Sequence, residues 1–128
     1  MKKNNMSEYS ILIVDDEEIV RVALGAFLED EGYKISSAIS GEEALEVMKK
    51  TSFNLGIIDM RLPGIDGDTL IMKAKRLQPD MKFIIHTGSM GYSISDTLVN
   101  AGISDRDVFK KPVKDMKKFL QIIRLHLE

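Results

Sequence analysis

The fold of this chain is decided by one stretch, Leu55-Gly56-Ile57-Ile58-Asp59-Met60-Arg61-Leu62-Pro63-Gly64, in which an apolar run ends abruptly in a carboxylate and then in a turn. A short apolar run bounded by turn signals is typical of a strand buried on both faces, and Pro63-Gly64 indicates a chain reversal just beyond it. Asp59 is therefore predicted at the carboxyl end of a buried strand, the edge at which open α/β sheets bind ligands. A lone aspartate is also typical of a loop cap. The rest of the chain is needed to distinguish a reactive acid from a loop cap.

Four other stretches have the character of short strands bounded by turn residues. Two of them, Ile11–Val14 and Phe83–Thr87, are mainly apolar, and Asp15-Asp16 closes the first. The other two, Lys34–Ile39 and Val108–Lys111, are more polar, as expected for strands at the edges of a sheet. Together with the stretch that ends at Asp59, they give five predicted strands.

Between these strands the apolar residues recur at helical spacing. The predicted helices are Glu17–Glu31, a second that starts at Gly41 after a Ser40 cap, Asp68–Leu77, Tyr92–Ala101 and Lys114–Leu127. The residues predicted to face the core are Ile19, Val20, Ala23, Leu24, Phe27 and Leu28 in the first helix, Ala44, Leu45 and Met48 in the second, Leu70, Ala74 and Leu77 in the third, and Met116, Phe119, Leu120, Ile123 and Leu127 in the last. Ile122 and Leu125 fall on the opposite side of the last helix.

Alternating strands and helices imply right-handed crossovers and a parallel sheet covered on both faces. The three most apolar strands should be central and the two polar strands outer. The order 2-1-3-4-5 meets this demand. We therefore predict the α/β class, as a flavodoxin-like, doubly wound, five-stranded parallel sheet with five helices. Residues 10–128 would form one domain after a flexible leader of residues 1–9.

Composition limits the classes of function. The chain has 128 residues, and 18 Lys and Arg against 20 Asp and Glu give a formal charge of -2. This balance gives no reason to expect nucleic acid or an anionic membrane as a direct partner. Zero cysteines exclude disulfides and thiolate metal sites and permit a reducing compartment. The apolar run nearest the amino terminus, Ile11–Val14, is too short for a secretory or spanning segment, so we expect the cytoplasm.

Polar residues that close the strands should meet in one crevice. Because the first and third strands are neighbours, Asp15, Asp16 and Asp59 arrive together. Carboxylates packed this closely either raise a pKa or recruit a cation. An all-oxygen site without His or Cys favours a hard divalent ion, so we predict Mg²⁺. Thr87 closes the fourth strand with a hydroxyl, and Lys111 closes the fifth with a positive charge.

Phosphoryl transfer onto a carboxylate is the chemistry that needs this set. Asp59 would attack phosphorus, and Mg²⁺ would neutralise charge on the acid and on the phosphoryl oxygens. Lys111 would hold one phosphoryl oxygen, and Thr87 would hydrogen-bond another. A base for water is not expected, because His86 lies in an apolar strand and should be packed, and His126 should be solvated.

From the first strand to the last helix, the chain resembles the receiver domain of a two-component response regulator. The residues that carry the resemblance are Asp15-Asp16, Asp59, the stretch Leu62-Pro63-Gly64-Ile65-Asp66-Gly67, Thr87 and Lys111-Pro112. It implies a phosphoprotein of phosphorelay signal transduction, in which Asp59 takes a phosphoryl group from a phosphohistidine on a sensor histidine kinase or phosphotransfer protein and so switches partner binding. It implies no enzyme beyond Mg²⁺-dependent self-phosphorylation and self-dephosphorylation on this aspartate.

The same resemblance implies individual roles and shows two departures. Asp16, Asp59 and the backbone carbonyl of Arg61 would bind Mg²⁺ directly, and Asp15 would act mainly through water. The aromatic residue that the family commonly has three positions before its lysine is here Val108, with Phe109 on the other face of the strand. Residues 103–107 also lack the usual Gly-Ala-Asp lead into the last strand.

Two other classes of function stay open. Asp66-Gly67-Asp68-Thr69 superficially resembles the signature of a haloacid dehalogenase-like phosphatase, although no second acid stands two residues after Asp59. A phosphorylation-independent, receiver-like interaction module is the other alternative. Whether the module is phosphorylated or not, Ile122 and Leu125 on the last helix are candidates for a surface that binds a second copy of the chain or a downstream protein.

Overall fold

The computed structural model of this chain describes residues 9–128. The predicted leader lies outside the described residues except for Tyr9. The Tyr9 carbonyl accepts a hydrogen bond from the backbone amide of Lys34 (3.0 Å), and its ring lies 6.5 Å from that of Tyr33. Tyr9 is thus attached to the beginning of the sheet.

One five-stranded parallel sheet has the order β2-β1-β3-β4-β5, which confirms the predicted topology. The two polar strands are the outer ones, and the pairings Val14↔Ile58 and Ile58↔Ile85 align the ends of the three central strands. The strands are β1 (Ser10–Val14), β2 (Lys34–Ala38), β3 (Leu55–Ile58), β4 (Lys82–Thr87) and β5 (Val108–Lys110).

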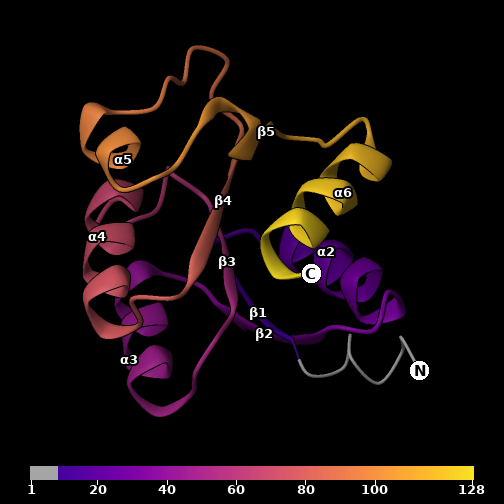
Figure 1. The fold of residues 1–128 in the computed structure, drawn as a ribbon, viewed down its shortest axis with the longest axis horizontal. Coiled ribbons are helices and arrows are strands. Elements are labelled where there is room, and N and C mark those ends of the chain that lie inside the picture. The colour runs from indigo at the N-terminus through magenta and orange to yellow at the C-terminus, as the bar shows by residue number, and fades with distance from the viewer. Residues whose placement is uncertain (1–8) are drawn as a thin grey trace.

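Helices cover both faces of this sheet. Figure 1 shows α3, α4 and α5 on one side and α2 and α6 on the other. Their bounds are α2 (Glu18–Asp30), α3 (Gly41–Lys50), α4 (Gly67–Leu77), α5 (Asp96–Asn100) and α6 (Met116–Leu127), and a 3₁₀ turn, η1 (Asp105–Asp107), precedes β5. None of the helices in residues 9–128 is long and apolar enough to cross a membrane.

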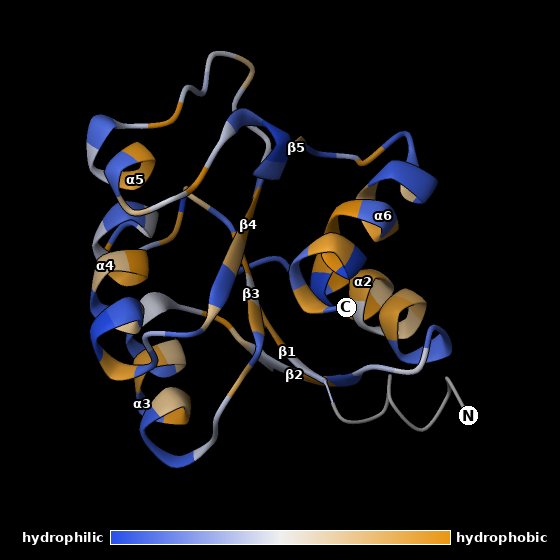
Figure 2. Cartoon of the chain, in the orientation of Figure 1, coloured by the Kyte–Doolittle hydropathy of each residue, from blue (hydrophilic) through white to orange (hydrophobic). Residues whose placement is uncertain are grey.

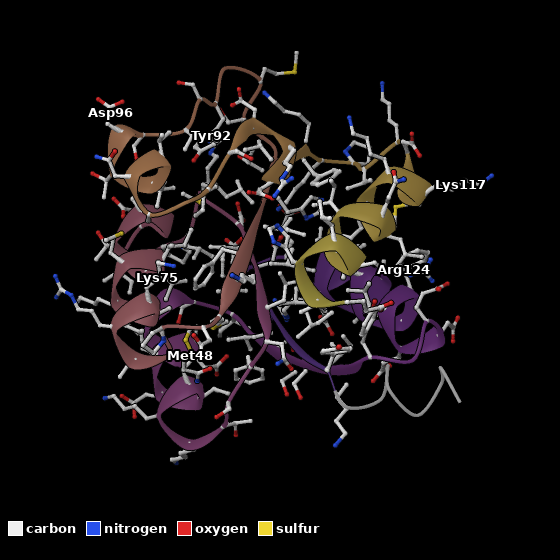
Figure 3. The ribbon with its side chains drawn as sticks, viewed as in Figure 1. Met48, Lys75, Tyr92, Asp96, Lys117 and Arg124 are labelled. Carbon is white, nitrogen blue, oxygen red and sulfur yellow. The ribbon has the colours of Figure 1, made fainter. Side chains whose placement is uncertain are left out.

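The core forms two layers, one on each face of the sheet. Successive side chains of a strand point to opposite faces, so Leu12 and Val14 pack under α3 and α4, whereas Ile11 and Ile13 pack under α2 and α6. This explains why the central strands are apolar at nearly every position. In Figure 2, hydrophobic residues, coloured orange, lie on the sides of α4 and α5 that face the sheet. In Figure 3, Met48 lies on the sheet side of α3, and Lys117 extends away from α6.

The predicted start of the second helix and end of the fourth are confirmed. The Ser40 side chain accepts a hydrogen bond from the Glu43 amide (3.1 Å), which caps α3. Gly102 follows α5 with φ of 98°, a conformation that favours glycine.

The inward face predicted for the first helix is wrong over its first turns. Ile19 is 83% exposed, and Ala23 is also exposed, whereas Leu24 and Leu28 are buried as predicted. The first turns of α2 line an open groove opposite Val113 and Met116, so no layer covers them.

The predicted helix Tyr92–Ala101 is wrong in its first half. Only Asp96–Asn100 is helical, and the Ser95 side chain caps it by accepting a hydrogen bond from the Leu98 amide (3.3 Å). Tyr92 and Ile94 instead pack from the preceding loop against the core. Serine competes for backbone hydrogen bonds and therefore favours a cap over a helix interior.

The expected division of the last helix is wrong at Ile122, which is only 8% exposed. Phe119, Ile122 and Ile123 form a stripe against the sheet that is wider than a single row. Met116, Leu120 and Leu127, expected in the core, are half-buried, and Leu77 at the end of α4 is exposed, as is Leu125.

Candidate functional site

Two buried carboxylates meet where β1 and β3 end. The Asp15 amide donates to the Ala38 carbonyl (3.1 Å), and the Asp59 amide donates to the Val14 carbonyl (2.9 Å), so both residues extend the hydrogen-bond ladders of their strands by one step. Their exposed fractions are 2% and 3%. The sheet itself therefore fixes the backbone beneath both acids.

The Lys111 ammonium joins these acids from the end of β5. Its Nζ lies 2.7 Å from Asp15 Oδ2, 3.3 Å from Asp59 Oδ2 and 3.3 Å from Glu17 Oε2. The Lys111 amide donates to the Thr87 carbonyl (2.8 Å), which ties this end of β5 to β4. One cation thus serves three carboxylates.

Lys110 points away from the acids, because successive side chains of a strand lie on opposite faces. Its Nζ donates to the backbone carbonyls of Ser89 (3.0 Å) and Met90 (2.7 Å) in the loop after β4. Of the two adjacent lysines, Lys111 is the one in the site.

Burial and charge act against each other here. Burial raises the pKa of the Asp15 carboxyl above its ordinary value, although the hydrogen bond and charge of Lys111 oppose the rise. Burial alone would lower the pKa of Lys111, but its contacts with Asp15, Asp59 and Glu17 outweigh burial and raise it. The lysine therefore stays charged, and the acidic pocket holds more carboxylates than it has cations to neutralise them.

The donor set suits a hard divalent cation. Asp15, Asp16, Glu17 and Asp59 each offer one carboxylate oxygen, and these oxygens all lie within 4.8 Å of one another. An oxygen-only set with two buried acids fits Mg²⁺ on chemical grounds. The Arg61 amide donates to Asp59 Oδ1 (3.0 Å), so the backbone that follows Asp59 turns back toward its carboxylate.

The loop from Arg61 to Asp66 is fixed at three points. Gly64 has φ of 78°, and the Glu42 carboxylate from α3 accepts a hydrogen bond from the Ile65 amide (3.1 Å). Asp66 caps α4 by accepting from the Thr69 amide (2.8 Å). The Asp66–Thr69 motif that favoured the phosphatase alternative is thus a helix cap.

Thr87 lies at the same edge of the sheet and is fully buried. Its Oγ1 accepts a hydrogen bond from the Ser89 amide (3.1 Å), so the hydroxyl is held within its own loop. The loop that follows carries Tyr92, which Figure 3 shows between β4 and α5.

The two residues of β5 that depart from the family pattern do lie on opposite faces. Val108 packs toward the α3–α5 layer. Phe109 packs toward the α2–α6 layer, with its ring edge-on to Phe119 at 4.9 Å between centroids. The aromatic side chain of β5 is therefore committed to the core beneath α6.

One histidine prediction is confirmed and one is wrong. His86 is buried in β4 beside Phe119, as expected of a packed residue. His126 is not solvated, because its Nε2 lies 2.7 Å from Oδ1 of the buried Asp107. Asp107 also accepts a hydrogen bond from the Ser104 amide (3.0 Å), so it ties α6 to the turn before β5.

Three residues near the acids were missing from the predicted site. Glu17 contacts Lys111, Arg21 Nη1 donates to the Asp15 carbonyl (2.7 Å), and Glu42 holds the loop after Asp59. A sequence signal existed only for Glu17, which directly follows the acidic pair. The roles of Arg21 and Glu42 depend on how helices and loops meet in space.

An apolar groove of about 400 Å³ opens beside the site. It runs between the first turns of α2 and the segment from Pro112 to Met116, and its lining includes Ile19, Ala23 and Lys111. The most exposed apolar side chain of α2 thus lies in the same groove as the lysine that contacts the buried acids.

Comparison with known proteins gives one consistent result. The family model described as "Response regulator receiver domain" matches residues 11–124. The response regulator GtcR of Aneurinibacillus migulanus is 34% identical over 113 residues, which are 88% of this chain and 46% of that protein. The chain covers still smaller shares, 9% and 30%, of a Brucella abortus sensor kinase, CckA, and a Thermotoga maritima cyclic di-GMP phosphodiesterase.

Solved structures agree. A CheY-like response regulator receiver domain protein from Methanospirillum hungatei is 35% identical with a TM-score of 0.79, and the match covers 93% of each chain. The response regulator TrrA of Thermotoga maritima, solved in complex with Mg²⁺-BeF, is 28% identical with a TM-score of 0.79 over 93% of this chain and 99% of that one.

Proposed function

Because this chain belongs to the response regulator receiver domain family, we propose that Asp59 accepts a phosphoryl group from a phosphohistidine on a sensor histidine kinase or a phosphotransfer protein. The observation that carries the proposal is the buried Asp59 carboxylate, with Oδ2 3.3 Å from the Lys111 ammonium and Oδ1 on the Arg61 amide. The domain would comprise residues 10–128 and act in the cytoplasm, consistent with zero cysteines.

The transfer uses the residues of the pocket. An Asp59 oxygen forms the new bond to phosphorus as the bond from phosphorus to the histidine nitrogen breaks, and the imidazole keeps that electron pair. Lys111 turns to a phosphoryl oxygen, and the Thr87 hydroxyl leaves the Ser89 amide to donate to another. The product is an aspartyl phosphate. Its hydrolysis is the only other reaction that we assign to the chain.

The donor set of the pocket fits Mg²⁺. In the proposal Asp16, Asp59 and the Arg61 carbonyl bind it directly, and Asp15 acts mainly through water. When bound, Mg²⁺ supplies positive charge to the phosphoryl oxygens during transfer. The TrrA neighbour was solved with Mg²⁺-BeF, which supports the same assignment here.

We place the donor protein on the groove beside α2. An apolar helix seated there would cover Ile19 and lie next to Lys111, so its phosphohistidine could reach Asp59. The alternative surface on α6 is weaker, because Ile122 is buried and leaves Leu125 alone. A homodimer or a downstream protein would depend on other contacts.

Intact mass after incubation with Mg²⁺ and acetyl phosphate tests this function. We expect one added phosphoryl group, absent in an Asp59→Asn variant and in a sample with EDTA. A folded, Mg²⁺-binding wild-type chain that gains no phosphoryl group and also fails to bind beryllofluoride would contradict the proposal. A beryllofluoride titration would then distinguish rapid self-hydrolysis, in which beryllofluoride still binds, from the phosphorylation-independent module.

A further inference from the structure

Glu17 is the charged residue in contact with the reacting groups that the proposed function leaves without a role. Its carboxylate lies 3.3 Å from the Lys111 ammonium. The Glu17 side chain is 61% exposed and that of Lys111 is 14% exposed, so this contact lies at the mouth of the pocket. The other two partners of the lysine, Asp15 and Asp59, are buried.

The backbone of Glu17 is held while its side chain is left free for this contact. The Glu17 amide donates to Asp15 Oδ1 (2.9 Å). Glu17 occupies the N-cap position of α2, yet its side chain makes no capping hydrogen bond there. A carboxylate at a helix start ordinarily finds favourable partners in the first amides of the helix. Here the carboxylate reaches Lys111 instead.

We propose that Glu17 is a positioning residue that keeps the Lys111 ammonium at the mouth of the pocket when Asp15 and Asp59 turn to a bound cation. This inference rests on the proposed function, because it concerns the state that receives the phosphoryl group. Two of the three carboxylates that now hold the lysine are the ones assigned to the metal. Glu17 also offers an oxygen to the acidic cluster, but the proposed function assigns it no contact with the metal. It is then the partner that remains, and it holds the ammonium where a phosphoryl oxygen arrives.

Charge and reach can be separated by substitution. Glu17→Gln keeps the length of the side chain and removes its charge. Glu17→Asp keeps the charge and shortens the side chain by one methylene, so it withdraws the carboxylate from Lys111. Glu18→Gln is the matched control, because Glu18 is the next residue, also exposed and in the first turn of α2. It reports the effect of losing one negative charge near the site.

The first measurement is the ¹⁵N-detected signal of the Lys111 ammonium, assigned with a Lys111→Arg variant, without and with saturating Mg²⁺. In the wild type and in Glu18→Gln, the ammonium signal should persist after Mg²⁺ is added. In Glu17→Gln and Glu17→Asp it should broaden or vanish through faster exchange with water once Mg²⁺ is bound. Mg²⁺ affinity from calorimetry ensures that all samples are equally loaded.

The second measurement is the rate of phosphorylation by acetyl phosphate at saturating Mg²⁺. We expect both Glu17 variants to be slower than Glu18→Gln by roughly two- to fivefold, the range that a largely exposed ion pair provides. Rates and ammonium signals in the Glu17 variants that match those of Glu18→Gln would overturn the inference. A wild-type chain that gains no phosphoryl group and binds no beryllofluoride would instead overturn the proposed function, so the two failures are distinguishable.

Discussion

His86 places an ionisable side chain inside the sheet. Burial, with the charge of Lys111 as a second cause, lowers the pKa of its imidazole to about 4 from the ordinary value of 6.5. The unfolded chain therefore binds a proton between these two pH values that the folded chain does not bind. Stability contributed by this residue is complete above the unfolded pKa and falls as the pH drops toward 4.

We predict that acidification from pH 7 to pH 5 costs the wild type about 2 kcal/mol more than it costs a His86→Leu variant. Urea unfolding at the two pH values measures both losses, and the carboxylates contribute to both proteins alike. An equal loss in the two proteins would show that the His86 imidazole titrates normally in the folded state.

Single residues differ in how far sequence can place them. Asp15, Asp59 and Lys111 were predicted together because each closes a strand, and the strands of a parallel sheet end at one edge. His126 was misplaced because its partner, Asp107, belongs to a turn that brings a buried acid under the last helix. Such a pairing depends on the packing of α6 and leaves no periodic signal in the sequence.

At the scale of elements, the strands were easier to predict than the helices. Short runs bounded by turn residues predicted all five strands, and each strand ends within one residue of its predicted end at the site edge. The helix predictions were wrong where an apolar residue lies outside a helix face that packs against the core. Ile19 lines a groove, and Tyr92 packs from a loop. Periodicity identifies an apolar stripe but not the surface that covers it.

The loop between β3 and α4 gives a prediction of its own. A Cβ added to Gly64 would lie 2.5 Å from the Glu42 carboxylate, and its φ of 78° disfavours other residues. We expect Gly64→Ala to lower the free energy of unfolding by about 1–2 kcal/mol and to weaken Mg²⁺ binding, because Arg61 lies in the same loop.

Gly102→Ala is the matched control for this loop. Gly102 has φ of 98°, but nothing lies within 4 Å of an added Cβ. It should therefore lose stability through backbone strain alone and keep the Mg²⁺ affinity of the wild type. Calorimetry measures the Mg²⁺ affinity of both variants, and thermal unfolding measures their stability. Equal Mg²⁺ affinities would show that the loop does not affect the metal site.

At the scale of the whole molecule, the topology was predictable because polarity alone separated the outer strands from the inner ones. The contacts of β5 were less so. Val108 packs in one core layer and Phe109 in the other, where its ring lies against Phe119, and Lys110 is exposed. Strand alternation predicted which face of the sheet carries the Phe109 side chain. Its contact with Phe119 depends on how α6 packs and could not be predicted.

Mg²⁺ should stabilise the entire fold. A ligand that binds only the folded state at one hundred times its dissociation constant adds about 2.7 kcal/mol, so we expect Mg²⁺ to raise the melting temperature and EDTA to reverse the rise. Without Mg²⁺, Asp59→Asn should melt higher than the wild type, because two buried acids then no longer compete for one lysine.

The same Asp59→Asn variant should lose most of the gain that Mg²⁺ gives. Differential scanning calorimetry of the two proteins with Mg²⁺ and with EDTA measures all four values. A variant that Mg²⁺ stabilises as much as it stabilises the wild type would remove Asp59 from the metal site.

The pocket joins Glu17 at the start of α2 to Lys111 after β5, residues that lie 94 positions apart. Asp59 is therefore synthesised well before Lys111. A chain that has been synthesised only as far as Asp59 carries the acids without their cation. The pocket is therefore complete only when the three-residue strand β5 pairs with β4 and brings Lys111 to the acids.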